Sequence, residues 1–291
     1  MDVTVALGGG GARGFAHIGV LRVLEREGFR IRAIAGTSMG GVIAAVYAAG
    51  YSPDEIEKHS AAASLPDLIR SRPVGPGLIG VRKIEAFLRK HLDDRDFDDM
   101  RIPLALTAVN LADGAAIVLR QGRVIEAVMA TTALPGIFPP YVLGEHRLLD
   151  GGVIDPVPVA AVRTLHAAPV VAVALSPAPE NWAETRSPAS LGLPLLGLVS
   201  RLRPAEVLTI ALRAVEITAR SMTELRLQID RPDVVIRPSV SHVGLLEGVR
   251  VAEVAALGQA AAEAALPQLR DLFTPRRRLE RGLQRAFGGE R

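Results

Sequence analysis

The feature that most constrains the fold of this chain is a serine in a short glycine-rich segment. Residues 36–40 read Gly-Thr-Ser-Met-Gly, which places Ser38 in the pattern Gly-x-Ser-x-Gly. An apolar run, 31–35, precedes the segment, and an apolar helical run, 41–49, follows it. A strand, a sharp turn and a helix are the context of a nucleophile elbow, where glycines leave room for strand and helix to converge. The pattern predicts a serine hydroxyl at a sheet edge, near the positive end of a helix.

A second glycine-rich turn follows the buried-strand pattern of residues 3–7. Residues 8–14 read Gly-Gly-Gly-Gly-Ala-Arg-Gly, and a helix pattern with apolar residues at helical spacing continues to Gly28. Backbone N–H groups without side chains at the start of a helix can hold an anion. The turn therefore provides candidate donors for the oxyanion of acyl transfer, where one donor contributes about 3–4 kcal/mol to the transition state.

The rest of the chain alternates strand and helix patterns. Predicted strands cover 102–111, 115–119, 147–149, 170–175 and 234–236, and predicted helices start at Pro53 and Asp155 and cover 81–92, 124–133, 204–222 and 246–266. Residues 64–80 read as a surface loop, and the apolar segment 186–203 fits either core packing or an exposed flap. The alternation predicts an α/β fold with three layers, helix–sheet–helix, around a mostly parallel central sheet.

Composition limits the classes of protein. The 291 residues contain no cysteine, which excludes disulfides and thiol nucleophiles, and no apolar run reaches transmembrane length. The start enters a strand pattern without a signal segment, so we expect a cytoplasmic protein. We expect one domain, 1–268, and an arginine-rich tail, 269–291. The tail segment 275–291 holds six Arg and two Glu. It favours solubility or attraction to an anionic membrane, while the few aromatic residues argue against nucleic acid.

The base that would activate the serine has several candidates. Asp150 follows the apolar run 147–149 and precedes two glycines, which would let its carboxylate turn toward the serine. A Ser-Asp dyad needs no histidine. An order of serine, acid and histidine leaves His166 and His242 as candidates after Asp150. Asp150 is also open to an interpretation without chemistry, as a turn residue whose side chain bonds its own backbone.

Taken together, these segments resemble the motifs of the patatin-like phospholipase family, with bacterial members the most similar. Residues 9–14 resemble its oxyanion motif, 36–40 its serine elbow and 150–152 its aspartate motif, and 134–140 resemble the segment before that aspartate. The resemblance extends from residue 3 to about 176. Many members have Asp-Gly-Ala where this chain has Asp-Gly-Gly, which leaves the carboxylate in place.

The resemblance implies a patatin-like fold and a serine acyl hydrolase that cleaves lipid carboxylic esters without metal or cofactor. It implies that Ser38 is the nucleophile and that Asp150 activates it. The oxyanion hole it implies consists of Gly9, Gly10, Gly11 and Arg13. Its other motif residues are Gly14, Gly36, Gly40, Gly151 and Gly152. The implied partner is a lipid ester. The tail adds an expected contact with a peripheral membrane surface, and the few aromatic residues argue for no nucleic acid. Head group, acyl chain and oligomeric state stay open.

Two alternatives belong to other classes. The spelling Gly9-x-Gly11-x-x-Gly14 also fits a dinucleotide-binding loop. That fold needs an acidic residue at the end of the second strand, where this chain has the segment 35–38, Ala-Gly-Thr-Ser. The other alternative is a lipid- or acyl-binding module that does not turn over its ligand.

Overall fold

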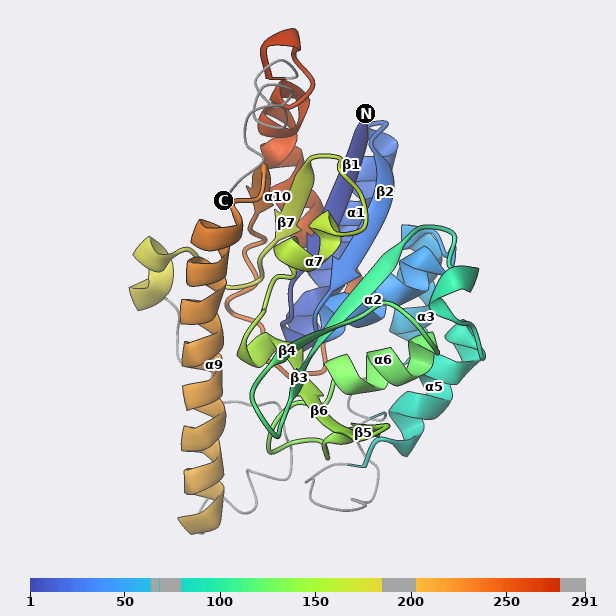
Figure 1. Ribbon diagram of the computed structural model, residues 1–291. Coiled ribbons are helices and arrows are strands. Elements are labelled where there is room, and N and C mark those ends of the chain that lie inside the picture. The colour runs from blue at the N-terminus through green and yellow to red at the C-terminus, as the bar shows by residue number, and fades with distance from the viewer. Residues whose placement is uncertain (64–67, 69–79, 185–202, 278–291) are drawn as a thin grey trace.

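The computed structural model describes residues 1–63, 68, 80–184 and 203–277, and its central element is an eight-stranded sheet. The strand order is β5-β6-β3-β2-β1-β7-β8, and β4 pairs with β3 (Figure 1). The strands are β1 Asp2–Leu7, β2 Arg30–Gly36, β3 Leu104–Asn110, β4 Ala116–Leu119, β5 Tyr141–Leu143, β6 His146–Asp150, β7 Val170–Val173 and β8 Val234–Ile236. The β1/β2, β1/β7, β2/β3 and β7/β8 pairs are parallel. The α/β class and the mostly parallel sheet are therefore confirmed.

Helices cover both faces of the sheet. The α-helices are α1 Ala16–Arg26, α2 Met39–Ala48, α3 Pro53–Ala62, α5 Arg82–Leu92, α6 Val124–Thr131, α7 Val159–Arg163, α9 Arg203–Asp230 and α10 Val251–Asp271. The 3₁₀ turns are η1 Gly11–Phe15, η2 Phe97–Asp99, η3 Gly151–Val153 and η4 Pro179–Glu184. Figure 1 shows α7 in front of the strands and α1 behind them. None of the helices in the described ranges is long and apolar enough to cross a membrane.

The two faces of the sheet differ in side-chain size. In β1, Val3, Val5 and Leu7 join a large cluster with α1, α2 and α10. On the opposite face Ala6 joins a smaller cluster, rich in alanine and valine, which packs against α7 and Leu227 of α9. Because strands buried on both faces carry apolar residues at successive positions, β1 is apolar from Val3 to Leu7 except at the buried Thr4. The large cluster supplies most of the buried core.

The long C-terminal helix begins later than its sequence pattern predicts. It covers Val251–Asp271, whereas the pattern predicts 246–266, and it continues past the expected domain boundary at 268. The reason is tertiary: the Leu245 carbonyl accepts a hydrogen bond from the Ala12 N–H at 2.8 Å, and Leu246 is buried beside Phe138. These contacts hold the segment before α10 in an irregular conformation.

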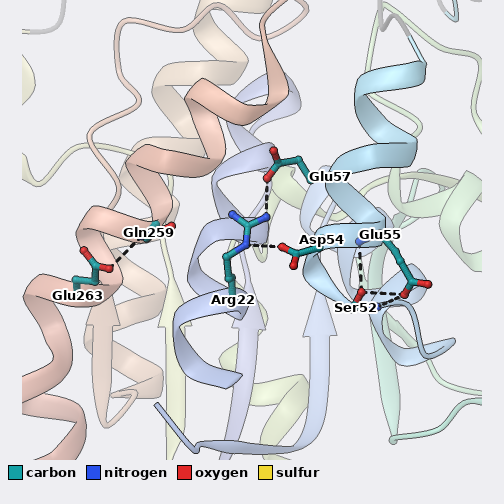
Figure 2. Close-up of polar contacts among 7 residues, drawn as sticks. All are labelled: Arg22, Ser52, Asp54, Glu55, Glu57, Gln259 and Glu263. Carbon is teal, nitrogen blue, oxygen red and sulfur yellow. Dashed lines mark hydrogen bonds and ion pairs between the residues drawn. The ribbon is translucent and has the colours of Figure 1, made fainter. Parts of the chain in front are cut away.

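The start of α3 follows its predicted capping box (Figure 2). The Ser52 hydroxyl accepts from the Glu55 N–H at 3.3 Å, and the Glu55 carboxylate accepts from the Ser52 N–H at 2.9 Å. Arg22 of α1 also binds Asp54 and Glu57 of α3, at 2.7 and 2.6 Å (Figure 2). A fixed N-terminus matters because the other end of α3 reaches the cavity described below.

Several other predictions can be compared with the structure. The hairpin predicted around residues 112–114 is present as the antiparallel pair β3/β4. Helix α9 extends to Asp230, beyond the predicted end at residue 222. The predicted loop 64–80, the apolar segment 186–203 and the tail from residue 278 lie almost entirely outside the described residues.

Candidate active site

The Ser38 turn has the backbone conformation of a strained elbow. Ser38 is the N-cap of α2 and has φ 55° and ψ −127°, a region that residues with side chains rarely occupy. Such a conformation costs about 1–3 kcal/mol and persists only where the surroundings impose it. The surroundings here leave no room for side chains, because a Cβ on Gly36 would collide with the Gly40 carbonyl and one on Gly40 with the Leu7 carbonyl. The strand–turn–helix predicted from the sequence is therefore present.

Three buried threonines fix this elbow to the neighbouring elements. The Thr131 hydroxyl of α6 accepts from the Ser38 N–H at 2.9 Å and donates to the Thr107 carbonyl of β3 at 2.6 Å. The Thr37 hydroxyl lies 2.6 Å from that of Thr107 and donates to the Asp155 carbonyl at 2.9 Å. No sequence pattern predicted this network of hydroxyls. Its only local signal is hydroxyl residues at the ends of apolar runs, which strand and helix patterns do not distinguish.

Asp150 lies at the end of β6, two positions along the sheet from the strand that carries the elbow. Its carboxylate accepts a hydrogen bond from the Gly152 N–H at 2.8 Å and interacts with the Ser38 side chain. Burial raises the pKa of Asp150 from 3.8 to about 6, and the bonds from Ser38 and Gly152 oppose that rise. The Asp150 side chain thus both bonds the backbone of its own turn and interacts with Ser38. An added Cβ on Gly151 would lie 2.6 Å from the Thr107 carbonyl oxygen, so this turn also packs tightly.

The N-terminal glycine turn lies against the serine, since a Cβ on Gly9 would be 3.2 Å from the Ser38 Cβ. The Gly9 N–H already donates to the Pro156 carbonyl at 2.9 Å, so Gly9 supplies space and no free donor. The N–H groups of Gly10 and Gly11 have no hydrogen-bond partner within the described ranges. Of the predicted oxyanion residues, Gly10 and Gly11 are therefore the ones whose N–H groups are open to an anion.

Arg13 has a role in holding the structure together. It is buried, with Nε donating to the Val243 carbonyl at 2.7 Å and Nη1 pairing with Glu216 of α9 at 2.9 Å. Its Nη2 is buried without a hydrogen-bond partner in the described part of the chain. Gly14 allows close packing one residue later, because a Cβ there would overlap the Met39 side chain. The positive charge of Arg13, predicted to support the oxyanion, is thus paired with Glu216 of α9.

None of the histidines occurs among the described residues that line the cavity. His17 of α1 is fully buried, and its Nε2 lies 2.7 Å from the Gly8 carbonyl. Burial lowers the pKa of His17 to about 4, so the ring is neutral at pH 7 and donates from Nε2 to that carbonyl. His17 therefore supports the glycine turn. Elsewhere, the Nδ1 of His166 accepts from the Ala168 N–H, and the His91 ring packs 4.7 Å from His59.

Ser38 and Asp150 line the same cavity, whose volume is about 220 Å³. Gly9, Gly10, Gly11, Arg13 and Gly152 line it as well. The remaining wall is mainly apolar, with Phe15, Ile84, Phe87, Leu134, Phe138 and Leu246. Helices α3 and α5 form one side, and α9 contributes Val215, Glu216, Ala219, Arg220 and Thr223 to another. A hydroxyl, a carboxylate and free amide hydrogens thus meet in a mostly apolar pocket, an arrangement suited to acyl transfer on an apolar ester.

Several known proteins are similar to this chain in sequence. The family model described as patatin-like phospholipase matches residues 5–163. An uncharacterised NTE family protein of Mycobacterium tuberculosis is 33% identical over 177 residues, which cover 60% of this chain and 49% of the relative. Patatin-like phospholipase domain-containing protein 6 of Homo sapiens is 31% identical over 180 residues, 59% of this chain and 13% of that protein. The chain thus spans about half the length of the mycobacterial relative.

The fold has a counterpart among solved structures. The crystal structure of VipD from Legionella pneumophila matches with a TM-score of 0.57 and 12% sequence identity. The match covers 91% of this chain and 66% of VipD, and it supports the fold alone. Because the family model covers more than half of the chain, including the glycine turn, the elbow and the aspartate, this chain belongs to the patatin-like phospholipase family.

Proposed function

We propose that this protein is a serine acyl hydrolase that cleaves carboxylic esters of lipids through a Ser38–Asp150 dyad. The observation that carries the proposal is the contact between a strained serine and a buried carboxylate in one apolar cavity. Family membership supports the same class of reaction. Because Asp150 itself interacts with Ser38, it can act as the base directly, and no histidine is needed between the two side chains.

In the first half of the proposed reaction, Asp150 accepts the proton of the Ser38 hydroxyl as the oxygen attacks the ester carbonyl. The carbonyl oxygen gains negative charge and is stabilised by the N–H groups of Gly10 and Gly11. Protonated Asp150 then returns the proton to the leaving alkoxide, and an acyl-enzyme remains. In the second half, water loses a proton to Asp150 and attacks the acyl carbonyl. The bond to the Ser38 oxygen then breaks, Asp150 returns its proton to that oxygen, and a fatty acid is released.

The pKa of Asp150 suits this role. A general base works best when its pKa lies just below the working pH, and burial brings the pKa of this carboxyl to about 6. We therefore expect kcat/KM to fall as the pH decreases through about 6. The Gly10 and Gly11 donors do not titrate in this range, so the acid limb reports the carboxylate.

The cavity wall supports an acyl chain as the bound group. Phe15, Phe87 and Phe138 offer apolar surface in the wall of the cavity, while Glu216, Arg220 and Thr223 of α9 supply polar groups to it. This division suits an ester with its acyl chain on the apolar wall and its alcohol toward the polar side. Phospholipid and lysophospholipid both fit this description.

Turnover of p-nitrophenyl butyrate and of a fluorogenic phospholipid tests the proposal. We expect hydrolysis by the wild type and loss of nearly all activity in Ser38→Ala and Asp150→Asn, with His242→Ala close to wild type as the matched control. Loss of activity in His242→Ala and its retention in Asp150→Asn would contradict the dyad. Tight binding of a lipid with no turnover of any ester would indicate a binding module.

A further inference from the structure

Over residues 214–229 of helix α9, apolar side chains face the solvent and charged side chains face the protein, the reverse of an ordinary surface helix. Between residues 214 and 229, every exposed position is uncharged: these are Ala214, Ile217, Thr218, Ser221, Leu225, Gln228 and Ile229. The large apolar side chains are strongly exposed, with 54% of Ile217, 48% of Leu225 and 60% of Ile229 accessible, and Ile210 one turn before the segment is 62% accessible. A surface helix normally directs charged residues to water and apolar residues inward.

The charged residues of this stretch lie toward the protein instead. Glu216 pairs with Arg13 at 2.9 Å, and Glu224 pairs with Arg237 at 2.8 Å. Arg226 lies 3.6 Å from the buried Asp155. These partners come from η1, from the loop after η3 and from the chain just after β8, so the charges fasten α9 to three parts of the fold. The outer face is then left without an acidic side chain.

The inner face of the same helix lines the Ser38 cavity. Val215, Ala219 and Thr223 belong to the cavity wall, while Ile217 and Leu225 do not. Figure 1 shows α9 along one edge of the molecule. The stretch from residue 210 to 229 spans about 29 Å at 1.5 Å per residue, and Arg213 is its one exposed charged residue among the described side chains. The outer face thus lies on the side of α9 opposite to the cavity wall.

We propose that the outer face of α9, defined by Ile210, Ile217, Leu225 and Ile229, docks onto the surface of a lipid bilayer and presents the Ser38 cavity to lipid esters. This inference rests on the proposed function, since it identifies a bilayer as the source of substrate. Interfacial helices insert their apolar face about 5–10 Å into the headgroup region. The absence of acidic groups on this face within 214–229 avoids repulsion from anionic headgroups.

A second copy of the chain is a less suitable occupant. Stable protein interfaces bury about 800 Å² on each partner and have a packed centre of large side chains. The outer face of α9 offers four half-exposed aliphatic side chains spread over about five turns, with Thr218 and Ser221 between them. Such separated side chains suit a fluid apolar phase, which needs no shape complementarity.

Sedimentation with vesicles tests the docking independently of catalysis. Wild type and an Ile217→Ser/Leu225→Ser double variant are mixed with vesicles of phosphatidylcholine containing 30% phosphatidylglycerol. We expect at least tenfold weaker vesicle binding by the double variant. Hydrolysis of vesicular phospholipid should fall at least fivefold, and turnover of soluble p-nitrophenyl butyrate should stay within twofold of wild type. Val142→Ser removes a similarly exposed side chain from β5 and should bind like wild type.

The salt dependence of vesicle binding distinguishes apolar docking from attraction through the tail, and light scattering detects a dimer. Apolar docking should persist at 0.5 M NaCl, whereas attraction through the arginine-rich tail alone would be screened. Equal vesicle binding by wild type and the double variant would overturn the proposal, as would a wild-type dimer that becomes monomeric in the double variant. Intact vesicle binding without turnover of any ester would contradict the proposed hydrolase and leave the docking surface standing.

Discussion

The serine elbow and helix α9 line the same cavity but are held in opposite ways. The elbow is fixed by uncharged groups: backbone carbonyls pressed against glycines and the hydroxyls of Thr37, Thr107 and Thr131, all of them buried. Helix α9 is fastened by ion pairs: Glu224 and Arg237 are both partly exposed, at 16% and 25%, while Glu216 pairs with the buried Arg13. Partly exposed ion pairs contribute little to stability, whereas unsatisfied buried groups cost much more.

This difference indicates two mechanical roles. A nucleophile must keep a fixed position, because a misplacement of 1 Å can cost about a hundredfold in rate. Helix α9 lines the cavity but supplies no reacting group of the proposed mechanism, so we expect it to tolerate more movement. Variants of the elbow should therefore have larger effects than variants of α9.

Removal of the nucleophile should have the largest effect. Ser38→Ala should reduce kcat by about a thousandfold or more, because no other group would form the acyl-enzyme. The free energy of unfolding should change by less than about 1 kcal/mol, since alanine keeps the strained backbone and loses only a small polar group. Stopped-flow burst kinetics with p-nitrophenyl butyrate, together with urea denaturation, measures both. Residual activity above a tenth of wild type would contradict the role of Ser38.

Asp150→Asn should separate activity from stability. The folded protein holds this carboxyl with a pKa of about 6, above its ordinary 3.8, so ionised Asp150 destabilises the fold as pH rises through that range. A shift of about two units corresponds to about 3 kcal/mol. Asparagine should therefore stabilise the protein by up to about that amount at pH 8 and by little at pH 4, while kcat falls about a thousandfold. Denaturation at both pH values would show equal differences if burial did not destabilise the carboxylate.

Thr131→Val should weaken the elbow by an intermediate amount. Valine has the same shape but leaves the Ser38 N–H without the acceptor it has at 2.9 Å, which costs about 1–3 kcal/mol. We also expect a lower kcat, because the turn that aims the serine loses a support. Thr218→Val on α9 removes an exposed hydroxyl bonded to the Ala214 carbonyl and should change the free energy of unfolding by less than about 0.5 kcal/mol. Equal effects of the two variants would remove the contrast between elbow and helix.

A change in the attachment of α9 should have the smallest effect on global stability. Glu224→Gln weakens the two-pronged pair with Arg237, at 2.8 and 2.9 Å, and should cost no more than about 1 kcal/mol. Amide exchange of α9 should accelerate while that of α2 stays unchanged, because the elbow does not depend on this pair. Hydrogen exchange followed by mass spectrometry measures the two helices separately. Equal acceleration in both would indicate that α9 and the elbow unfold as one unit.

Local patterns predicted the fold class, the elbow and the β3/β4 hairpin, because each depends on neighbours in sequence: an apolar run, a glycine turn or a capping box. They failed where distant contacts decide. Helix α10 starts at Val251 because the Leu245 carbonyl is bonded to Ala12, 233 positions earlier. The Gly9 donor is occupied by the Pro156 carbonyl, which no motif reveals.

The roles of the buried polar side chains around the site could not be predicted from the sequence either. His17 and Thr131 look like ordinary members of helical apolar stretches, yet each bonds the backbone of another element. The inward orientation of the charged residues of α9 also depends on tertiary partners, since Glu216 and Glu224 form ion pairs with Arg13 and Arg237.

Covalent labelling tests the central claim most directly: that Ser38 is a nucleophile activated by Asp150. A fluorophosphonate reacts when a serine oxygen attacks phosphorus and fluoride leaves, and peptide mass spectrometry identifies the labelled residue. We predict a single adduct on Ser38, faster at pH 8 than at pH 5 and at least a hundredfold slower in Asp150→Asn. A label on another residue, or labelling of Ser38 at the same rate in Asp150→Asn, would contradict the account.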